Sequence, residues 1–177
     1  HGMGKTTVAR AMCNELDSNP YFVNSSLAKN IDTLRTSITD YASTGSLLSN
    51  SRKVVILDEG DYLNAQSTQP ALRAFTEQFS KNCGFILTCN YPNRIMPQLR
   101  SRFSPQLEFS IPNDEKPEMA RQFFVRACEI LTAEGVTYEE AVVAQVVTHY
   151  FPDYRRVLNE LQGYAITGTI DSGIISL

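Results

Sequence analysis

Three short apolar segments, separated by stretches with helical periodicity, constrain the fold of this chain more than any other feature. They are YFVN (21–24), KVVILDE (53–59) and GFILTCN (84–90). The second is apolar over 54–57, which is typical of a strand covered on both faces. Alternation of such strands with helices predicts an α/β fold with a parallel sheet, and it argues against an all-α or all-β domain. QLEFSI (106–111) is expected to be the last strand.

Helical spacing marks the segments around these strands. Val8, Ala9, Met12 and Leu16 predict a helix over 5–16 with one buried face. Ser67 or Thr68 is expected to cap a later helix. Further helices are marked by Ile31, Leu34 and Ile38, by Leu72, Phe75 and Phe79, and by a short piece over 97–102.

IPNDEKPE (111–118) predicts a domain boundary, because prolines flank a possible capping residue and acidic residues follow it. We therefore expect two domains, at 1–112 and 113–177. The second has helical periodicity and predicts a small helical domain.

Within that domain, apolar spacing predicts helices around 119–130 and 154–161. Thr137 and Glu140 match a capping box ahead of AVVAQVV (141–147). The valine pairs in that segment allow a strand as an alternative to a helix.

Composition excludes some classes of protein. The formal net charge of −3 gives no global attraction to nucleic acid, so a DNA contact would need a local basic surface. No apolar stretch approaches the roughly 20 residues that cross a bilayer, and no leader is recognisable, so we expect a cytoplasmic protein without membrane contact. The four cysteines contain no CxxC pair, which favours buried thiols in a reducing compartment over a zinc site.

The chain opens with HGMGKTT, which contains the second half of a phosphate-binding loop. Gly4, Lys5 and Thr6 match its last positions, and the first glycine of the pattern would lie before His1. Backbone N–H groups at a helix start bind anionic oxygens, Lys5 can reach phosphates, and Thr6 can ligate Mg²⁺. The alternative is a plain helix N-terminus.

Two further polar groups follow predicted strands. Asp58 and Glu59 end the apolar run at 54–57, and Asn90 ends the next strand. The carboxyl ends of parallel strands are where open α/β sheets bind ligands. Asp58 could hold a metal, Glu59 could polarise a water molecule, and Asn90 could orient it. The alternatives are a solvated acidic turn and an ordinary Asn-Tyr-Pro turn.

Together, the segments GKTT, VVILDEGD, FILTCN and LRSRF resemble the small, ATPase subunits of AAA+ DNA polymerase clamp loaders, which include replication factor C small subunits. FPDYRRVLNEL and IDSGIISL are most similar to the clamp loaders of T-even-type phages. The resemblance implies a P-loop NTPase sheet followed by an all-helical lid domain. It also implies an ATP-hydrolysing subunit that opens a sliding clamp and loads it onto primer-template DNA.

The resemblance assigns ATP and Mg²⁺ as cofactors. Thr6 and Asp58 would hold the metal. Arg155 would reach the γ-phosphate from the lid, with the adjacent Arg156 as the alternative. The residues expected to bind the nucleotide are Gly2, Gly4, Lys5, Thr6, Thr7 and Arg155.

The catalytic residues implied by the family are Glu59, Asn90 and Arg102. Arg102 is the second arginine of LRSRF and would act in trans, as an arginine finger in the site of the neighbouring subunit. Side chains between Asn64 and Arg73 would contact DNA.

The implied partners are a sliding clamp, primer-template DNA and the other subunits of a pentameric hetero-oligomer, in the host cytoplasm if the chain is phage-encoded. Family members also carry a strand before the phosphate loop, in the sheet order 5-1-4-3-2, and a helical collar after the lid. Because neither is present here, we expect the 177 residues alone to aggregate readily and to have weak or no activity. A micromolar ATP affinity by isothermal titration would contradict this.

Two positions depart from the family pattern: Gly60 replaces a bulkier residue, and Phe103 replaces a cysteine. Glycine at 60 could loosen the turn that places Glu59. The functional alternatives are another AAA+ replication ATPase, such as an initiator or helicase loader, and a non-hydrolysing scaffold subunit.

Overall fold

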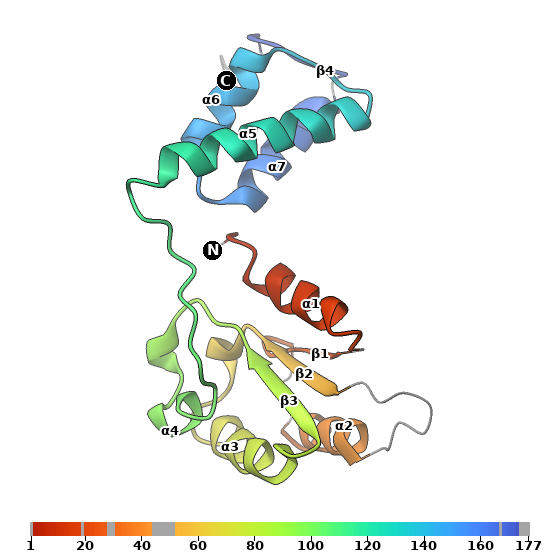
Figure 1. Cartoon of the computed structure of the whole chain (residues 1–177), viewed down its shortest axis with the longest axis vertical. Helices are drawn as coiled ribbons and strands as arrows, with labels where there is room; N and C mark the ends of the chain where they lie inside the picture. Colours follow the sequence, from red (N-terminus) through yellow and green to blue (C-terminus); the bar gives the residue numbers. More distant parts are fainter. Residues whose placement is uncertain (1, 19, 28–30, 44–51, 167, 174–177) are drawn as a thin grey trace. The chain divides into compact units, whose positions relative to one another are not determined.

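The computed structural model describes the chain except for residues 1, 19, 28–30, 44–51, 167 and 174–177, and except for the side chains of residues 31, 33 and 34. It comprises two compact units. The sheet unit is Lys5–Leu107, and the helical unit is Glu108–Leu177 together with His1–Gly4 (Figure 1). Among the described residues, no helix combines the length and the apolar character needed to cross a membrane.

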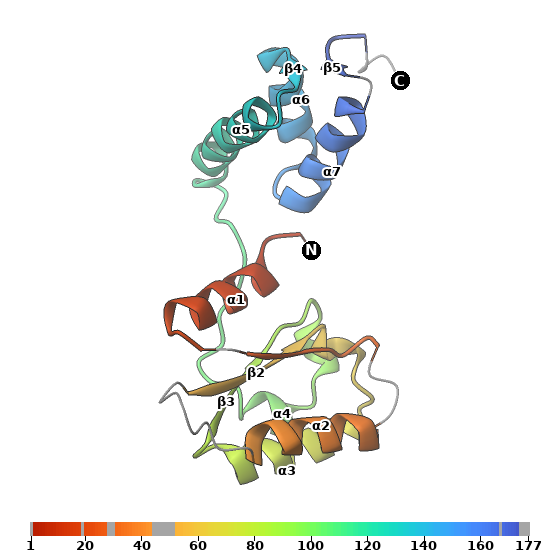
Figure 2. The ribbon, with the colours of Figure 1, turned by 90° about the vertical axis from the view of Figure 1, so that its right-hand side faces the viewer.

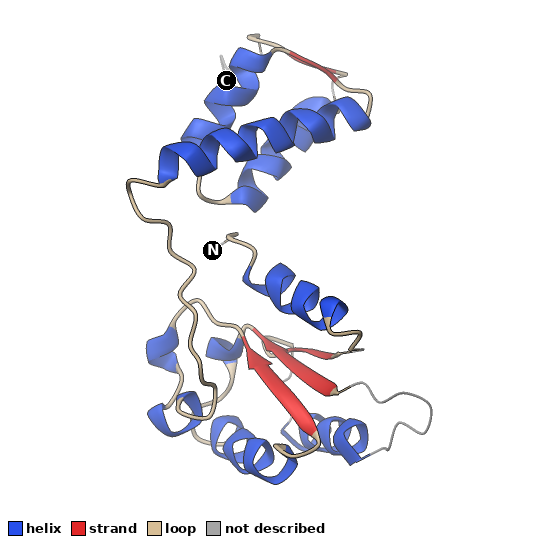
Figure 3. Ribbon diagram, in the orientation of Figure 1, coloured by secondary structure: helices blue, strands red, loops and turns tan. Residues whose placement is uncertain are grey.

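The sheet unit contains three parallel strands, in the order β1-β2-β3 (Figure 3). This order agrees with the expected one for the strands concerned. Asn24 pairs with Asp58, and Leu57 pairs with Leu87. Its elements are α1 (Lys5–Glu15), β1 (Tyr21–Asn24), α2 (Ile31–Ser43), β2 (Lys53–Asp58), the 3₁₀ turn η1 (Gly60–Tyr62), α3 (Thr68–Phe79), β3 (Cys83–Leu87), the 3₁₀ turn η2 (Pro92–Arg94) and α4 (Pro97–Arg100).

Both faces of the sheet are covered, as the apolar run in β2 predicts. Val54 and Ile56 face α1, where they pack with Ala9 and Cys13. The alternate residues of β2, Val55 and Leu57, pack on the opposite side with α2, α3 and α4 (Figure 2). Period-two alternation of a strand therefore divides the core into two layers.

The buried face of α1 differs from the predicted one. Only Ala9 of the four expected residues is buried, whereas Val8, Met12 and Leu16 are 40%, 45% and 70% exposed. The helix contacts the sheet through Ala9 and Cys13, one turn apart. Helical periodicity alone did not distinguish the apolar stripe that touches the sheet from its neighbour.

The predicted strand at 106–111 is absent: these residues form no ladder with any described segment. In the expected strand order, its partner is the strand that precedes the phosphate loop, and no such strand is among the described elements. An extended segment without a hydrogen-bonding partner is not a β-strand.

The cap predicted for α3 also differs. Ser67 occupies the N-cap position but makes no capping hydrogen bond through its side chain. Instead, Asn64 Oδ1 accepts hydrogen bonds from the backbone N–H groups of Gln66 and Ser67, at 2.8 and 3.0 Å. The turn before the helix is thus closed by an Asx-type interaction.

The helical unit has one apolar core, formed by α5, α6 and α7. The segment 141–147 is helical, and Asp153 caps α7 by accepting from the backbone N–H of Arg156. The expected capping box is wrong, because Thr137 lies in a strand and Glu139 is the N-cap of α6.

The elements of the helical unit are α5 (Lys116–Ala133), β4 (Thr137–Tyr138), α6 (Glu140–Tyr150), α7 (Tyr154–Ala165) and β5 (Thr169–Ile170). The strands β4 and β5 pair in parallel, which the sequence did not predict.

We predict that Leu72→Ala lowers the free energy of unfolding by about 2–5 kcal/mol, because it leaves a cavity under α3. Leu72 is fully buried, whereas Leu107 of the same unit is 71% exposed. Leu107→Ala is the matched control and should change stability by less than about 0.5 kcal/mol. Urea unfolding followed by circular dichroism measures both, and equal losses would contradict this description of the core.

Candidate nucleotide-binding site

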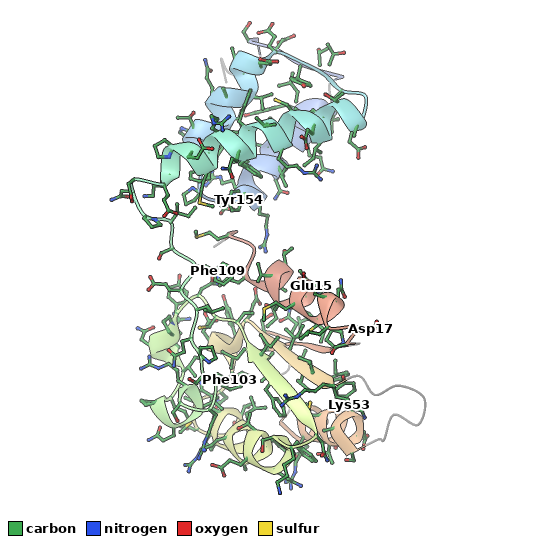
Figure 4. The ribbon with its side chains drawn as sticks, viewed as in Figure 1. Glu15, Asp17, Lys53, Phe103, Phe109 and Tyr154 are labelled. Carbon is green, nitrogen blue, oxygen red and sulfur yellow. The ribbon has the colours of Figure 1, made fainter. Side chains whose placement is uncertain are left out.

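Three segments meet at the carboxyl edge of the sheet through one carboxylate oxygen. Asp58 ends β2, Thr6 lies in the first turn of α1, and Thr88 follows β3. The Thr6 hydroxyl donates to Asp58 Oδ1 at 2.6 Å, and the Thr88 hydroxyl donates to the same oxygen at 2.5 Å. The start of the phosphate-loop helix is therefore joined to the acidic end of β2. Lys53 lies at the other end of that strand (Figure 4).

Glu59 follows Asp58 in a left-handed backbone conformation, with φ of 56°. Such values are uncommon for residues other than glycine and persist where surrounding contacts enforce them. Here the N–H of Glu59 donates to Thr88 Oγ1 at 3.3 Å, and the N–H of Gly60 donates to the Thr88 carbonyl at 2.8 Å. Thr88 therefore holds both the carboxylate of Asp58 and the backbone of Glu59.

Gly60 is buried against β3, and its role differs from the expected loosening of the turn. A Cβ at this position would lie 2.8 Å from Leu87 Cγ and 3.0 Å from both Leu87 δ-carbons. These distances are shorter than normal carbon contacts. Glycine leaves room here for the Leu87 side chain to pack closely against the turn after Glu59.

Asp61 is a buried carboxylate, 6% exposed, and lies near the polar residues that follow β3. Its Oδ1 accepts from the backbone N–H of Asn90 at 3.3 Å, while Oδ2 has no hydrogen-bond partner among the described residues. Burial, and then the Asp61 charge, raise the pKa of the Cys89 thiol, whereas Lys5 and Arg100 lower it. The Lys5 ammonium therefore acts electrostatically on the same edge of the sheet as Asp61 and Asn90.

The glycines of the opening loop have the conformations that a tight phosphate-binding turn needs. Gly2 and Gly4 have φ of +68° and +81°, where a side chain would be strained. Lys5 and Thr6 are half-buried, and Thr7 is exposed in the first turn of α1. The backbone conformation is consistent with the phosphate loop that the sequence predicted.

The remaining predicted residues lie outside this group. Arg102 follows α4 and forms an ion pair with Glu77. Arg155 is exposed in the first turn of α7, in the helical unit, and has no ion pair among the described residues. Its neighbour Arg156 pairs with Glu160 at 3.9 Å and stacks over Tyr150. The existing contacts of Arg156 favour Arg155 over Arg156 as the residue available to a ligand.

Two polar residues of the site region escaped sequence reasoning. The first is Thr88. The sequence feature that could have revealed it is a hydroxyl side chain at the end of an otherwise apolar strand. Gln69 is the other: it is fully buried in α3, and its amide bonds to the backbone of Leu63, Arg94 and Met96 at 2.7–3.0 Å. Nothing in the local pattern distinguishes it from a surface glutamine.

Comparison with known proteins gives two family matches. Residues 1–111 match the family described as "ATPase family associated with various cellular activities (AAA)". Residues 115–176 match the family described as "Sliding-clamp-loader large subunit, AAA+ ATPase lid domain".

Individual relatives agree with these matches. The chain is 40% identical to the sliding-clamp-loader large subunit of Enterobacteria phage T4, over 99% of this chain and 55% of that protein. It is 32% identical to the replication factor C small subunit of Methanococcus vannielii, over 98% of this chain and 55% of that protein. The chain thus spans about half the length of the curated relatives it matches. The predicted resemblance is confirmed, although the phage proteins carry the name large subunit.

Among solved structures, the Thermotoga maritima RuvB Holliday junction branch migration motor superposes with a TM-score of 0.71 at 17% identity, over 98% of this chain and 56% of that one. This likeness confirms the predicted fold class, a P-loop sheet flanked by helices with a lid. At this identity it carries no information about function.

We predict that Thr88→Val lowers the free energy of unfolding by about 1–3 kcal/mol, since the Glu59 N–H loses its acceptor and Asp58 loses a donor in a half-buried site. Thr88→Ser keeps the hydroxyl and should recover most of this loss. Thermal or urea unfolding measures the difference. Valine and serine variants of equal stability would show that the hydroxyl does not hold this edge.

Proposed function

Because the chain belongs to the AAA family of ATPases, we propose that it binds ATP with Mg²⁺ at the carboxyl edge of its sheet and hydrolyses it as a subunit of a sliding-clamp loader in DNA replication. The observation that carries the proposal is the pair of hydrogen bonds from Thr6 and Thr88 to Asp58, which joins the phosphate loop to the acidic strand end. The clamp-loader assignment rests on the lid family and on the phage relatives.

The oxygens at this edge suit Mg²⁺. The cation prefers oxygen ligands about 2.1 Å away in octahedral geometry, which separates adjacent ligands by about 3.0 Å. Thr6 Oγ1 and Asp58 Oδ1 already lie 2.6 Å apart. A small outward movement would let both ligate one cation, directly or through water. When bound, Mg²⁺ would neutralise charge that develops on the transferred phosphoryl group.

The residues around this position supply the rest of the chemistry. The turn at Gly4 and the start of α1 present backbone N–H groups to phosphate oxygens, and Lys5 adds a positive charge. Glu59 accepts a proton from the attacking water and so increases its nucleophilicity. Asn90, tied through its backbone to Asp61, orients that water without adding charge.

Two arginines complete the proposed site, one from the helical unit and one from the sheet unit of the neighbouring subunit. Arg155 binds the γ-phosphate from the lid. Arg102 acts on the nucleotide of the neighbouring subunit, where such a guanidinium contributes on the order of 10³ to 10⁵ in rate, or about 4–7 kcal/mol. A subunit without its neighbours therefore turns over ATP slowly.

The proposed partners follow from the clamp-loader assignment. They are a ring-shaped sliding clamp, the other subunits of a pentamer and primer-template DNA, in the cytoplasm of the host cell. Because the chain has a net charge of −3, its DNA contacts are local ones, on the segment from Asn64 to Arg73.

The test of this function is clamp-stimulated ATP turnover by the assembled full-length protein. Turnover should rise when clamp and primer-template DNA are added together, and should fall steeply with salt, because phosphate contacts release counterions. If a replication initiator or a helicase stimulates turnover and a clamp does not, the clamp-loader assignment is wrong and another AAA replication role replaces it.

We predict that Glu59→Gln in the assembled protein abolishes turnover while preserving ATP binding, since the amide keeps the shape of the side chain but cannot accept the proton. Phosphate release and equilibrium binding of a fluorescent ATP analogue separate the two effects. Glu15→Gln, at an exposed position of α1, is the control and should change neither. Unchanged turnover in Glu59→Gln would favour a scaffold subunit.

A further inference from the structure

Arg102 is already engaged within its own subunit. Its Nη2 donates to Oε1 of Glu77, on α3, and the Nε of Arg73 lies 3.8 Å from the same oxygen. Glu77 therefore lies between two arginines and contacts the one proposed to act in trans.

The backbone beneath this pair is well fixed. Gln69, about two turns before Glu77 on α3, accepts from the Met96 N–H at 2.7 Å and donates to the Arg94 carbonyl at 3.0 Å. These bonds tie α3 to the segment that leads into α4. Leu99 is fully buried, and its carbonyl accepts from the Arg102 N–H at 2.9 Å.

The side chains, by contrast, are free to reach a partner. Arg102 and Glu77 are 42% and 46% exposed. A guanidinium has five N–H donors, and the contact with Glu77 engages only Nη2. Among the described residues, the other donors of Arg102 make no side-chain contact, so they can bind phosphate oxygens while the carboxylate holds one end of the group.

We infer that Glu77 is a positioning residue for Arg102: its carboxylate orients the guanidinium toward the nucleotide of the neighbouring subunit. This inference rests on the proposed function, in which Arg102 acts in trans. Glu77 itself touches no nucleotide.

We expect Glu77 to have a modest effect on the rate of ATP hydrolysis, because both side chains of the pair are exposed to solvent. Because solvent screens the attraction between the two charges, Glu77 acts mainly by restricting the rotamers of the Arg102 side chain. Complete loss of that restriction for an arginine corresponds to about thirtyfold in rate. Because Arg102 is exposed and only partly restricted, we expect loss of the Glu77 contact to lower the rate of hydrolysis about three- to tenfold.

The test is a double-mutant cycle in the assembled full-length protein, with single-turnover ATP hydrolysis and nucleotide affinity as readouts. Glu77→Gln should lower the maximal rate about three- to tenfold with unchanged nucleotide affinity, and Glu77→Asp should retain more of the rate. In the background of Arg102→Ala, Glu77→Gln should have no further effect. Glu118→Gln removes another exposed ion pair, with Arg121, and should leave the rate unchanged.

The possible outcomes distinguish a failure of the Glu77 inference from a failure of the proposed function. An unchanged or increased rate in Glu77→Gln overturns the inference alone, as does an equal loss with and without Arg102. If Arg102→Ala does not slow hydrolysis, the trans-acting role fails, and the positioning role of Glu77 fails with it.

Discussion

One carboxylate oxygen, Asp58 Oδ1, joins the three segments on which the rest of the site depends. Hydroxyl groups from the first turn of α1 and from the residue after β3 both donate to it. These bonds are possible because parallel strands end at the same edge of the sheet. The same threonine that completes the contact from β3 also bonds to the backbone of Glu59, which is left-handed, so the proposed metal ligand Asp58 and the proposed general base are fixed together.

The sequence predicted the elements of the fold that depend on local composition. Apolar runs gave the three strands, the family resemblance gave their order, and helical periodicity gave the long helices α1, α2, α3, α5 and α7, whereas the segment of α6 was left open between helix and strand. Predictions failed where a distant partner decides the outcome. Residues 106–111 have strand-like composition but pair with no segment that the structure describes, and Thr137 pairs with Thr169 instead of capping α6. Val8, Met12 and Leu16 have the periodicity of a buried face, yet the sheet contacts the neighbouring stripe.

The site was predictable to the extent that its residues belong to motifs. Thr6, Asp58 and Glu59 were found from the spacing of polar residues at helix starts and strand ends. Thr88 was not, because its importance comes from the contacts of its hydroxyl with Asp58 and with the Glu59 N–H, at the end of β2. Gly60 likewise has a packing role that only the proximity of Leu87 reveals. Residue roles that depend on another subunit, as for Arg102, came from the family resemblance alone.

Thr6 and Asp58 are proposed to form together the Mg²⁺ position of an ATP site. The most direct measurement is the affinity of the full-length protein for ATP with and without Mg²⁺, compared between the wild type and Asp58→Asn. The account predicts that Mg²⁺ tightens ATP binding at least about tenfold in the wild type and has little effect in the variant, because the amide is a far weaker ligand. An equal gain from Mg²⁺ in both proteins would contradict it.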